Sequence, residues 1–262
     1  MKSIMTQINR RKAFTSLGMI GSAAMFAGCS ESGLGVANAQ SHSAPVWNYV
    51  KLDPTEVADR TYRLYSEGGC MYGLVGGVLG ALADKVGEPF RSFPIEMMRY
   101  GDGGVGGYGS LCGVVNGGSA LIGMFHHEKP KEQREAMIAE LVVWYETTPL
   151  PQYKPVNPEW ADDAEPSVSG SILCHLSTNR WCDASGYEAF SMEKKERCRR
   201  LAADGASKVV ELLNRDLDGV QILGELTPQV QSCIDCHGQE EMGNTMVKMN
   251  CGACHQFDGK HP

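Results

Sequence analysis

Two C-x-x-C-H motifs near the C-terminus constrain this 262-residue chain more than any other feature. They read Cys233-Ile234-Asp235-Cys236-His237 and Cys251-Gly252-Ala253-Cys254-His255. In this pattern two thiols three positions apart can bond the two vinyl groups of one porphyrin, and the next residue, a histidine, lies under the iron. The motifs therefore predict two covalently attached haems c. The attachment residues are Cys233, Cys236, Cys251 and Cys254, and the proximal iron ligands are His237 and His255.

Two other interpretations of these cysteines stay open. A zinc ribbon also has two C-x-x-C pairs at a similar separation, and a pair of disulfides is the other possibility. A zinc ribbon does not require a histidine directly after each pair, and it has no need of export. The two adjacent histidines therefore favour haem.

The first 39 residues have the features of an export signal. These are Arg10-Arg11 with Phe14, a mildly apolar stretch over 17–28, and a small-x-small cleavage site at Ala37-Asn38-Ala39. We expect a twin-arginine signal peptide over 1–39 and a periplasmic protein, with an ordinary secretory signal as the alternative. A second cleavage would make Cys29 a lipid anchor. No apolar run is long enough to span a bilayer, so no integral membrane span is expected.

The charge balance bears on partners. The whole chain has a formal net charge of −7, and the signal region holds four basic residues and one acidic residue, so the mature chain has about −10. Such a negative balance argues against binding of nucleic acid, because phosphates require a basic protein face. It would suit a basic redox protein partner.

Five more cysteines lie in the body of the mature chain. They are Cys70, Cys112, Cys174, Cys182 and Cys198. In an exported protein disulfides are the ordinary expectation. However, the twin-arginine route carries folded proteins, often with a cofactor already inserted. Thiols in a folded body would then suit an iron–sulfur cluster, which takes about four cysteinates.

Hydrophobic periodicity predicts helices and shows no alternating strand pattern. A helix should begin at Asp53-Pro54, where a capping Asp precedes Pro, and break at Gly68-Gly69. Further helices are expected over 70–86, 111–125, 131–145, 167–181 and 193–213, with a proline-rich loop over 149–166. The last of these helices should bury its leucines and valines and expose its charges. The predicted fold is all-α. A helical bundle body spans 40–214, a linker 215–228, and a C-terminal, mostly irregular dihaem segment 229–262.

The order of the body cysteines resembles a redox-active family named for its pattern C, GCAxxG, C, C. The matching stretches are Gly68-Gly69-Cys70, Cys112-Gly113-Val114-Val115-Asn116-Gly117, Cys182, and Glu196-Arg197-Cys198-Arg199-Arg200. Leu111 and Val114 depart from the motif, where Gly and Ala would stand. Cys174 has no counterpart, so it is either a core thiol or a substitute ligand.

With two haem motifs and export added, the mature chain is similar to the split-Soret cytochromes c within that family. The resemblance implies a homodimer with two c haems per subunit, bis-histidine ligation, and a haem ligand that crosses between subunits. It also implies an iron–sulfur-type site on Cys70, Cys112, Cys182 and Cys198.

The distal haem ligands are the least determined part of the site. His175 is the first choice because it adjoins Cys174, and His126 and His127 come next. His42, His261 and the tail methionines 242, 246 and 249 are alternatives. The short tail has few large apolar residues, so the body or a second subunit must cover the porphyrins. The expected function is electron transfer. The alternative is a redox enzyme that reduces a small molecule at the thiol-ligated metal or at an open haem position.

Overall fold

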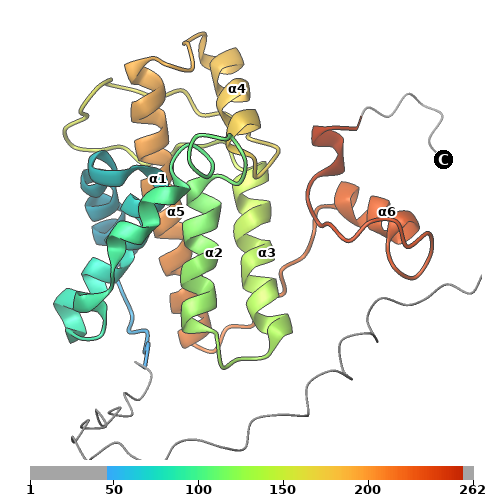
Figure 1. Ribbon diagram of the computed structural model, residues 1–262, viewed down its shortest axis with the longest axis horizontal. Helices are drawn as coiled ribbons and strands as arrows, with labels where there is room; N and C mark the ends of the chain where they lie inside the picture. The colour runs from blue at the N-terminus through green and yellow to red at the C-terminus, as the bar shows by residue number, and fades with distance from the viewer. Residues whose placement is uncertain (1–45, 256–262) are drawn as a thin grey trace, which may run out of the picture. The chain divides into compact units, whose positions relative to one another are not determined.

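The computed structural model describes residues 46–255, in which the regular structure is helical (Figure 1). The helices are α1 (Pro54–Val86), α2 (Gly113–Phe125), α3 (Lys131–Thr147), α4 (Cys174–Ser185), α5 (Met192–Leu217) and α6 (Pro228–His237). Short 3₁₀ turns lie at Phe90–Ser92, Ile95–Gly101 and Cys251–Ala253. Within this range β pairing is limited to two isolated bridges, so the all-α prediction is confirmed. The expected signal peptide, Cys29, His42 and His261 lie outside the described residues.

Helix α1 begins and breaks where its sequence predicts. The Asp53 side chain accepts hydrogen bonds from the Thr55 and Glu56 backbone N–H groups, at 2.8 and 3.2 Å, and Pro54 opens the first turn. Gly68 and Gly69 leave helical geometry. Gly69 has φ +81°, and a Cβ there would lie 2.2 Å from an Asp102 carboxylate oxygen. This break separates two helical halves and places Cys70 at the start of the second.

The bundle is built from α1, α2 and α5, which contact one another, with α3 packed against α2 and α5 (Figure 1). Gly205 of α5 allows the closest approach, because a Cβ there would come within 2.3 Å of Val114 on α2. Leu74 and Leu141 are completely buried in the shared core. Each such side chain contributes about 1.5–3 kcal/mol relative to an exposed one. None of the described helices is long and apolar enough to cross a membrane.

Helix α4 starts at Cys174, seven residues later than predicted. Residues 167–173 are instead irregular, with an isolated β-bridge at each end, because other parts of the chain bind them. Ser167 and Leu150 exchange two backbone hydrogen bonds, and the Ser169 hydroxyl donates to the Tyr145 carbonyl at 3.1 Å. Serine side chains that bond to nearby backbone in this way compete with helix formation.

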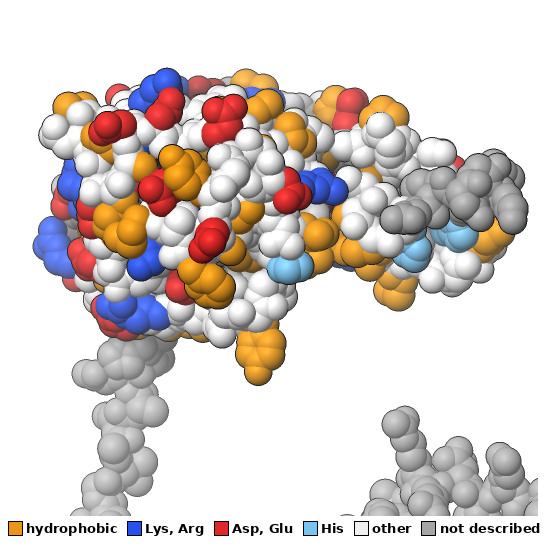
Figure 2. All heavy atoms as spheres, turned by 90° about the horizontal axis from the view of Figure 1, so that it is seen from above, with side chains coloured by type: hydrophobic (Ala, Val, Ile, Leu, Met, Phe, Trp, Pro, Cys, Tyr) orange, Lys and Arg blue, Asp and Glu red, His pale blue; other side chains and the backbone are white. Residues whose placement is uncertain are grey.

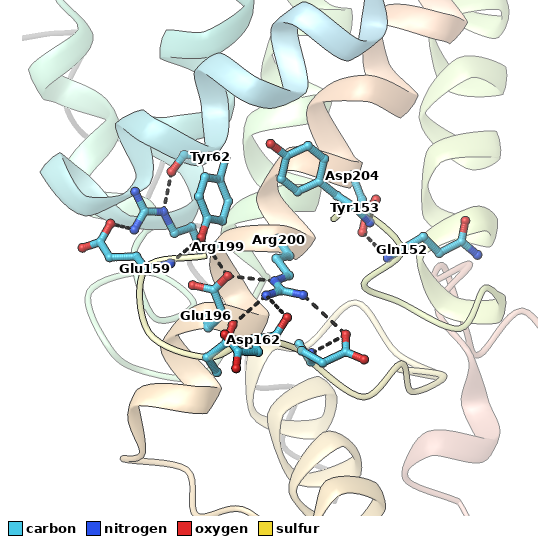
Figure 3. Close-up of polar contacts among 12 residues, drawn as sticks. Tyr62, Gln152, Tyr153, Glu159, Asp162, Glu196, Arg199, Arg200 and Asp204 are labelled. Atoms are coloured by element: carbon cyan, nitrogen blue, oxygen red, sulfur yellow. Dashed lines mark hydrogen bonds and ion pairs between the residues drawn. The ribbon is translucent and has the colours of Figure 1, made fainter. Parts of the chain in front are cut away.

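Four charged side chains in the first half of α5 are buried, which corrects the prediction that the charges of this helix face outward: Glu196, Arg197, Arg199 and Arg200. Figure 3 shows polar contacts of three of them. Glu196 is 0% exposed and Arg200 is 2% exposed. The Arg200 Nε and the Tyr62 hydroxyl both donate to Glu196 Oε1 at 2.7 Å. Burial is tolerated because each charge has partners.

Two arginines of α5 also hold the loop that connects α3 to α4. Arg200 donates to the Ala161 and Asp162 carbonyls at 2.7 and 3.2 Å. The guanidinium of Arg199 pairs with Glu159 and lies 5.2 Å from the Trp160 ring centroid. The loop segment 159–162 is therefore fixed over the first turns of α5.

Candidate redox centres

The first haem motif is carried by α6. The Thr227 side chain accepts from the Val230 N–H at 3.4 Å and Pro228 follows it, so the helix begins just before the motif. Helical spacing places Cys233 and Cys236 on one face, and His237 is the last helical residue. This arrangement is what one porphyrin needs to bond both thiols.

The second haem motif begins with the 3₁₀ turn Cys251–Ala253. Asn250 caps this turn by accepting from the Gly252 N–H at 3.1 Å. Its side-chain nitrogen donates to the Gly170 carbonyl at 2.9 Å, which ties the motif to the body. The buried Glu146 carboxylate accepts a backbone hydrogen bond from Asn250. Burial raises the pKa of Glu146 although this bond opposes the rise.

The two motifs adjoin. The Cys233 and Cys251 thiols lie close enough to interact, and burial, followed by this interaction, raises the pKa of Cys233. Cys236 and Cys254 are exposed, while Cys233 and Cys251 are half-buried, and all four are free thiols. Attachment chemistry therefore has access to each sulfur, so the residues present fit two covalent haems.

His237, the histidine of the first motif, is oriented by a neighbour. The His237 Nδ1 lies 3.1 Å from the Asn244 side-chain oxygen. A hydrogen bond at one ring nitrogen fixes the tautomer and the ring plane of a histidine that ligates through the other. The contact suits His237 as a proximal ligand through Nε2.

His126 is placed by the structure in the core, not at a haem. It is 2% exposed, and its ring nitrogens lie 3.2 Å from the Ile122 carbonyl and 3.1 Å from Asp216 Oδ2. Both nitrogens are thus engaged: Nδ1 contacts the last turn of α2, and Nε2 links the end of α2 to α5. Of the three candidate distal ligands, His126 is the one that its environment disfavours.

His127 and His175 are both exposed. His127 Nδ1 contacts the Met124 carbonyl at 2.9 Å. His175 lies in the first turn of α4, where its Nε2 is 3.3 Å from the Asn179 side-chain nitrogen, also at the surface. A contact between two exposed side chains is readily exchanged for another partner, so His175 and His127 remain the distal candidates.

Four of the five body cysteines gather around one cleft. Cys70, Cys174 and Cys198 line an open cleft of about 350 Å³, together with Lys194, Asp102 and Trp160. Cys112 is the N-cap residue of α2 and is buried beside them. The sulfurs of Cys112 and Cys174 are close enough to each other, and to Cys198, to interact electrostatically. Burial raises the pKa of Cys174 to about 12.

Cys198 is the thiol most readily ionised. A hydrogen bond from Cys70, and then the positive charges of Lys194 and Arg197, lower its pKa well below the usual value although the side chain is buried. The Nη1 atom of Arg197 lies 3.8 Å from the Cys198 sulfur, and the Nη2 atom of Arg197 donates to the Ser177 hydroxyl at 2.8 Å. A thiolate is the form of cysteine that ligates metal. The pair of cations thus prepares Cys198 for ligation.

The remaining body cysteine, Cys182, lies two turns further along α4 than Cys174. It is partly exposed and is not among the residues that line the cleft. Within residues 46–255, no three His, Cys, Asp or Glu side chains converge tightly enough for a single metal ion. Three of the thiols line the cleft, and Cys112 is buried beside them.

Several residues of these centres were not predicted from the sequence. Arg197, Lys194 and Asn250 carry no motif by themselves. The only sequence signal is that Lys194 lies four residues before Cys198 on a helix, which places it on the same face; Arg197, the adjacent residue, carries no such signal. Asn250 directly precedes Cys251, but its link to Gly170 depends on tertiary structure.

Comparison with known proteins agrees with this arrangement. Residues 76–212 match the family described as "Putative redox-active protein (C_GCAxxG_C_C)". Split-Soret cytochrome c of Desulfovibrio desulfuricans is 34% identical over 218 residues, which are 80% of this chain and 77% of that protein. A solved structure of that cytochrome, described as containing a novel iron centre, superposes with a TM-score of 0.75 at 33% identity. It covers 80% of this chain and 90% of the solved one. This chain therefore belongs to the split-Soret cytochrome c family of redox proteins.

Proposed function

We propose that this protein is an exported, periplasmic dihaem c cytochrome that transfers electrons between redox protein partners. The observation that carries the proposal is the pair of C-x-x-C-H motifs, whose thiols Cys233 and Cys251 lie close enough to interact. Because each thiol is an attachment point of its own porphyrin, two haems bound here would begin side by side. Adjacent haems can pass an electron from one to the other.

The haems supply reversible one-electron chemistry at iron, and the chain supplies attachment, ligation and cover. His237 and His255 act as proximal ligands, and His175 or His127 supplies a distal nitrogen. Asn250 and Glu146 hold the second motif against the body, so the distance between this motif and the body is fixed.

A homodimer is part of the proposal. Most of the described tail, including Met242 and Met246, is exposed, so the tail does not cover a porphyrin face by itself. Large apolar side chains also stand on the surface, as Figure 2 shows for one face of the molecule. Tyr108 and Phe190 are 89% and 97% exposed. A second subunit would cover both kinds of surface.

The body cysteines form the third centre of the proposal. We assign Cys70, Cys112 and Cys198 as ligands of an iron–sulfur cluster, and the family pattern nominates Cys182 as the fourth. The iron centre described for the Desulfovibrio desulfuricans relative supports the presence of iron in this chain. The buried Arg197 and the half-buried Lys194 would offset the negative charge of cysteinates at this site.

One observation favours an enzyme over an electron-transfer protein. The cysteine cleft is open, and its volume of about 350 Å³ is enough for a small molecule next to the thiols. The second candidate is therefore a small-molecule reductase that works at this site or at an open haem position.

Carbon monoxide distinguishes the two functions. We expect the natively exported protein to show six-coordinate, low-spin haem spectra in both oxidation states, with no change when carbon monoxide is added to the reduced form. It should sediment as a dimer. A rapid spectral change with carbon monoxide would reveal an open position and favour the enzyme. An absence of haem bands would end the cytochrome proposal and leave only a reductase that works at the cysteine cleft.

A further inference from the structure

We infer that Glu146 is a proton-binding residue whose charge is coupled to the oxidation state of the second haem. This inference rests on the proposed covalent haem at Cys251 and Cys254, and it concerns a carboxylate that belongs to no motif of the sequence. Glu146 takes up one proton from solvent when a redox protein delivers one electron to the haem iron. It releases this proton when the iron passes the electron on.

Glu146 lies at the end of α3, where this helix meets the second haem motif, and it is 3% exposed. The backbone N–H of Asn250, the residue directly before Cys251, lies close enough to stabilise the carboxylate charge. The Asn250 side chain donates to the Gly170 carbonyl at 2.9 Å, and the Gly170 N–H donates to the Glu146 carbonyl at 2.8 Å. These contacts hold the carboxylate against the backbone that carries the second haem.

One oxygen of this carboxylate is buried without a hydrogen-bond partner in the described part of the chain, namely Glu146 Oε1. A buried ionised carboxylate that lacks partners is costly, and binding of a proton removes this cost. Burial accordingly raises the pKa of Glu146, whereas the N–H groups of Asn250 and Ile172 and the charge of Arg180 lower it. Because these effects oppose one another, a change of charge nearby can shift the protonation of Glu146.

The groups packed around Glu146 leave it as the one that titrates in this contact. Arg180 of α4 is the charged side chain that acts on it, and the Arg180 Nη1 donates to the Ser169 carbonyl at 2.6 Å. A guanidinium stays protonated throughout the working pH range. The tail and the segment over 170–172 present uncharged backbone N–H groups to the carboxylate.

Reduction of the haem supplies the change of charge, because it removes one positive charge from the iron. A positive charge nearby favours the ionised carboxylate, so its loss favours the protonated acid. The coupling is reciprocal, and protonation of Glu146 therefore makes the haem easier to reduce. Burial of Glu146 keeps this interaction from being screened by water and salt.

Glu146→Gln in the full exported chain tests the inference, because the amide oxygen can still accept from the neighbouring N–H groups but binds no proton. The measurement is a redox titration of the haems at several values between about pH 5 and 9. In the parent, the potential of one haem should fall as the pH rises, by up to about 59 mV for each tenfold drop in proton concentration. In Glu146→Gln this haem should lose that dependence and stay near the parental potential at low pH.

Glu135→Gln is the matched control. Glu135 pairs with Lys248, two residues before Asn250, at 3.9 Å, but its side chain is 45% exposed. Solvent screens such a pair, so this variant should keep the parental pH profile. A parental profile in Glu146→Gln would overturn the inference, as would potentials of the parent that do not change with pH. A role of Glu146 in anchoring the tail alone would not alter the pH profile of the glutamine variant.

Infrared difference spectra of the parent, reduced minus oxidised, provide a measurement that does not depend on a variant folding. Reduction should produce the carbonyl band of a protonated carboxylic acid, and this band should shift in heavy water. Its absence from the parent, or its persistence in Glu146→Gln, would contradict the inference. Absence of covalent haem from the parent would instead refute the proposed function on which the inference rests.

Discussion

Replacement of Glu196 by alanine should destabilise the protein strongly. The change removes the acceptor of the Tyr62 hydroxyl and of Arg200 Nε, both at 2.7 Å, and leaves the Arg200 guanidinium buried at 2% exposure. Removal of one partner of a buried ion pair costs about 3–5 kcal/mol. Arg200 keeps its bonds to the Ala161 and Asp162 carbonyls and its ion pair with Asp163 at 3.5 Å, so we expect a loss of about 3 kcal/mol, at the lower end of this range.

Urea unfolding of the mature protein, followed by far-ultraviolet circular dichroism, measures this loss. The matched control is Glu96→Ala, which breaks a surface pair with Arg99 in which both side chains are largely exposed. Its unfolding midpoint should remain at the parental value, because solvent screens exposed pairs. If Glu196→Ala unfolds at the same urea concentration as the control, the buried network does not stabilise α5 and the reasoning fails.

Three further predictions concern ligation, pH and export. His175→Ala should give a five-coordinate or water-bound haem and a weaker dimer, visible in the electronic spectrum and in sedimentation at several dilutions, whereas an unchanged low-spin dimer transfers the ligand role to His127. Burial raises the pKa of Asp204 to about 6. The stability that its protonated form contributes is present below about pH 4 and is lost as pH rises through 6. In urea titrations, the free energy of unfolding of the parent should therefore fall by up to about 3 kcal/mol over this interval relative to that of Asp204→Asn. Parallel pH profiles of the two proteins would refute the raised pKa of Asp204. Changing Arg10-Arg11 to Lys-Lys should leave unprocessed precursor in the cytoplasm, and continued export by the general secretory route would remove the argument for a cofactor inserted before export.

Local signals in the sequence were sufficient for much of the bundle. Asp53-Pro54 and Gly68-Gly69 act through capping and backbone geometry within a few residues, and the start and the break of α1 follow from them. The start of α4 depends on Leu150 and Tyr145, which are far away in the sequence, so periodicity alone placed it too early. The domain boundaries at 40, 214 and 229 stay predictions, although α5 continues to Leu217.

The burial of charge at the start of α5 shows a second limit. Glu196, Arg199 and Arg200 look like a solvated helix face when only their residue types are considered. They are buried because Tyr62 and the loop over 159–162 supply partners from other parts of the chain. Pairing of this kind is a tertiary property that periodicity does not report.

The haem motifs depend on local sequence, whereas the proposed cysteine site depends on tertiary structure. C-x-x-C-H is a local pattern, so the attachment residues can be identified without a structure. The proposed cysteine site depends on residues from separate helices, such as Cys70 of α1 and Cys198 of α5. The bridge between Leu111 and Leu173, which brings Cys174 to Cys112, becomes visible only in the fold.

The intact mass of the natively exported chain, measured under denaturing conditions, tests the central claim most directly. Covalent haem survives denaturation, whereas zinc and free haem do not remain bound. We predict a mass equal to the mature polypeptide plus two haems, and a loss of one haem when Cys251 and Cys254 are both changed to alanine. A mass equal to the polypeptide alone, with zinc recovered from the native protein or with the four tail cysteines paired as disulfides, would contradict the account.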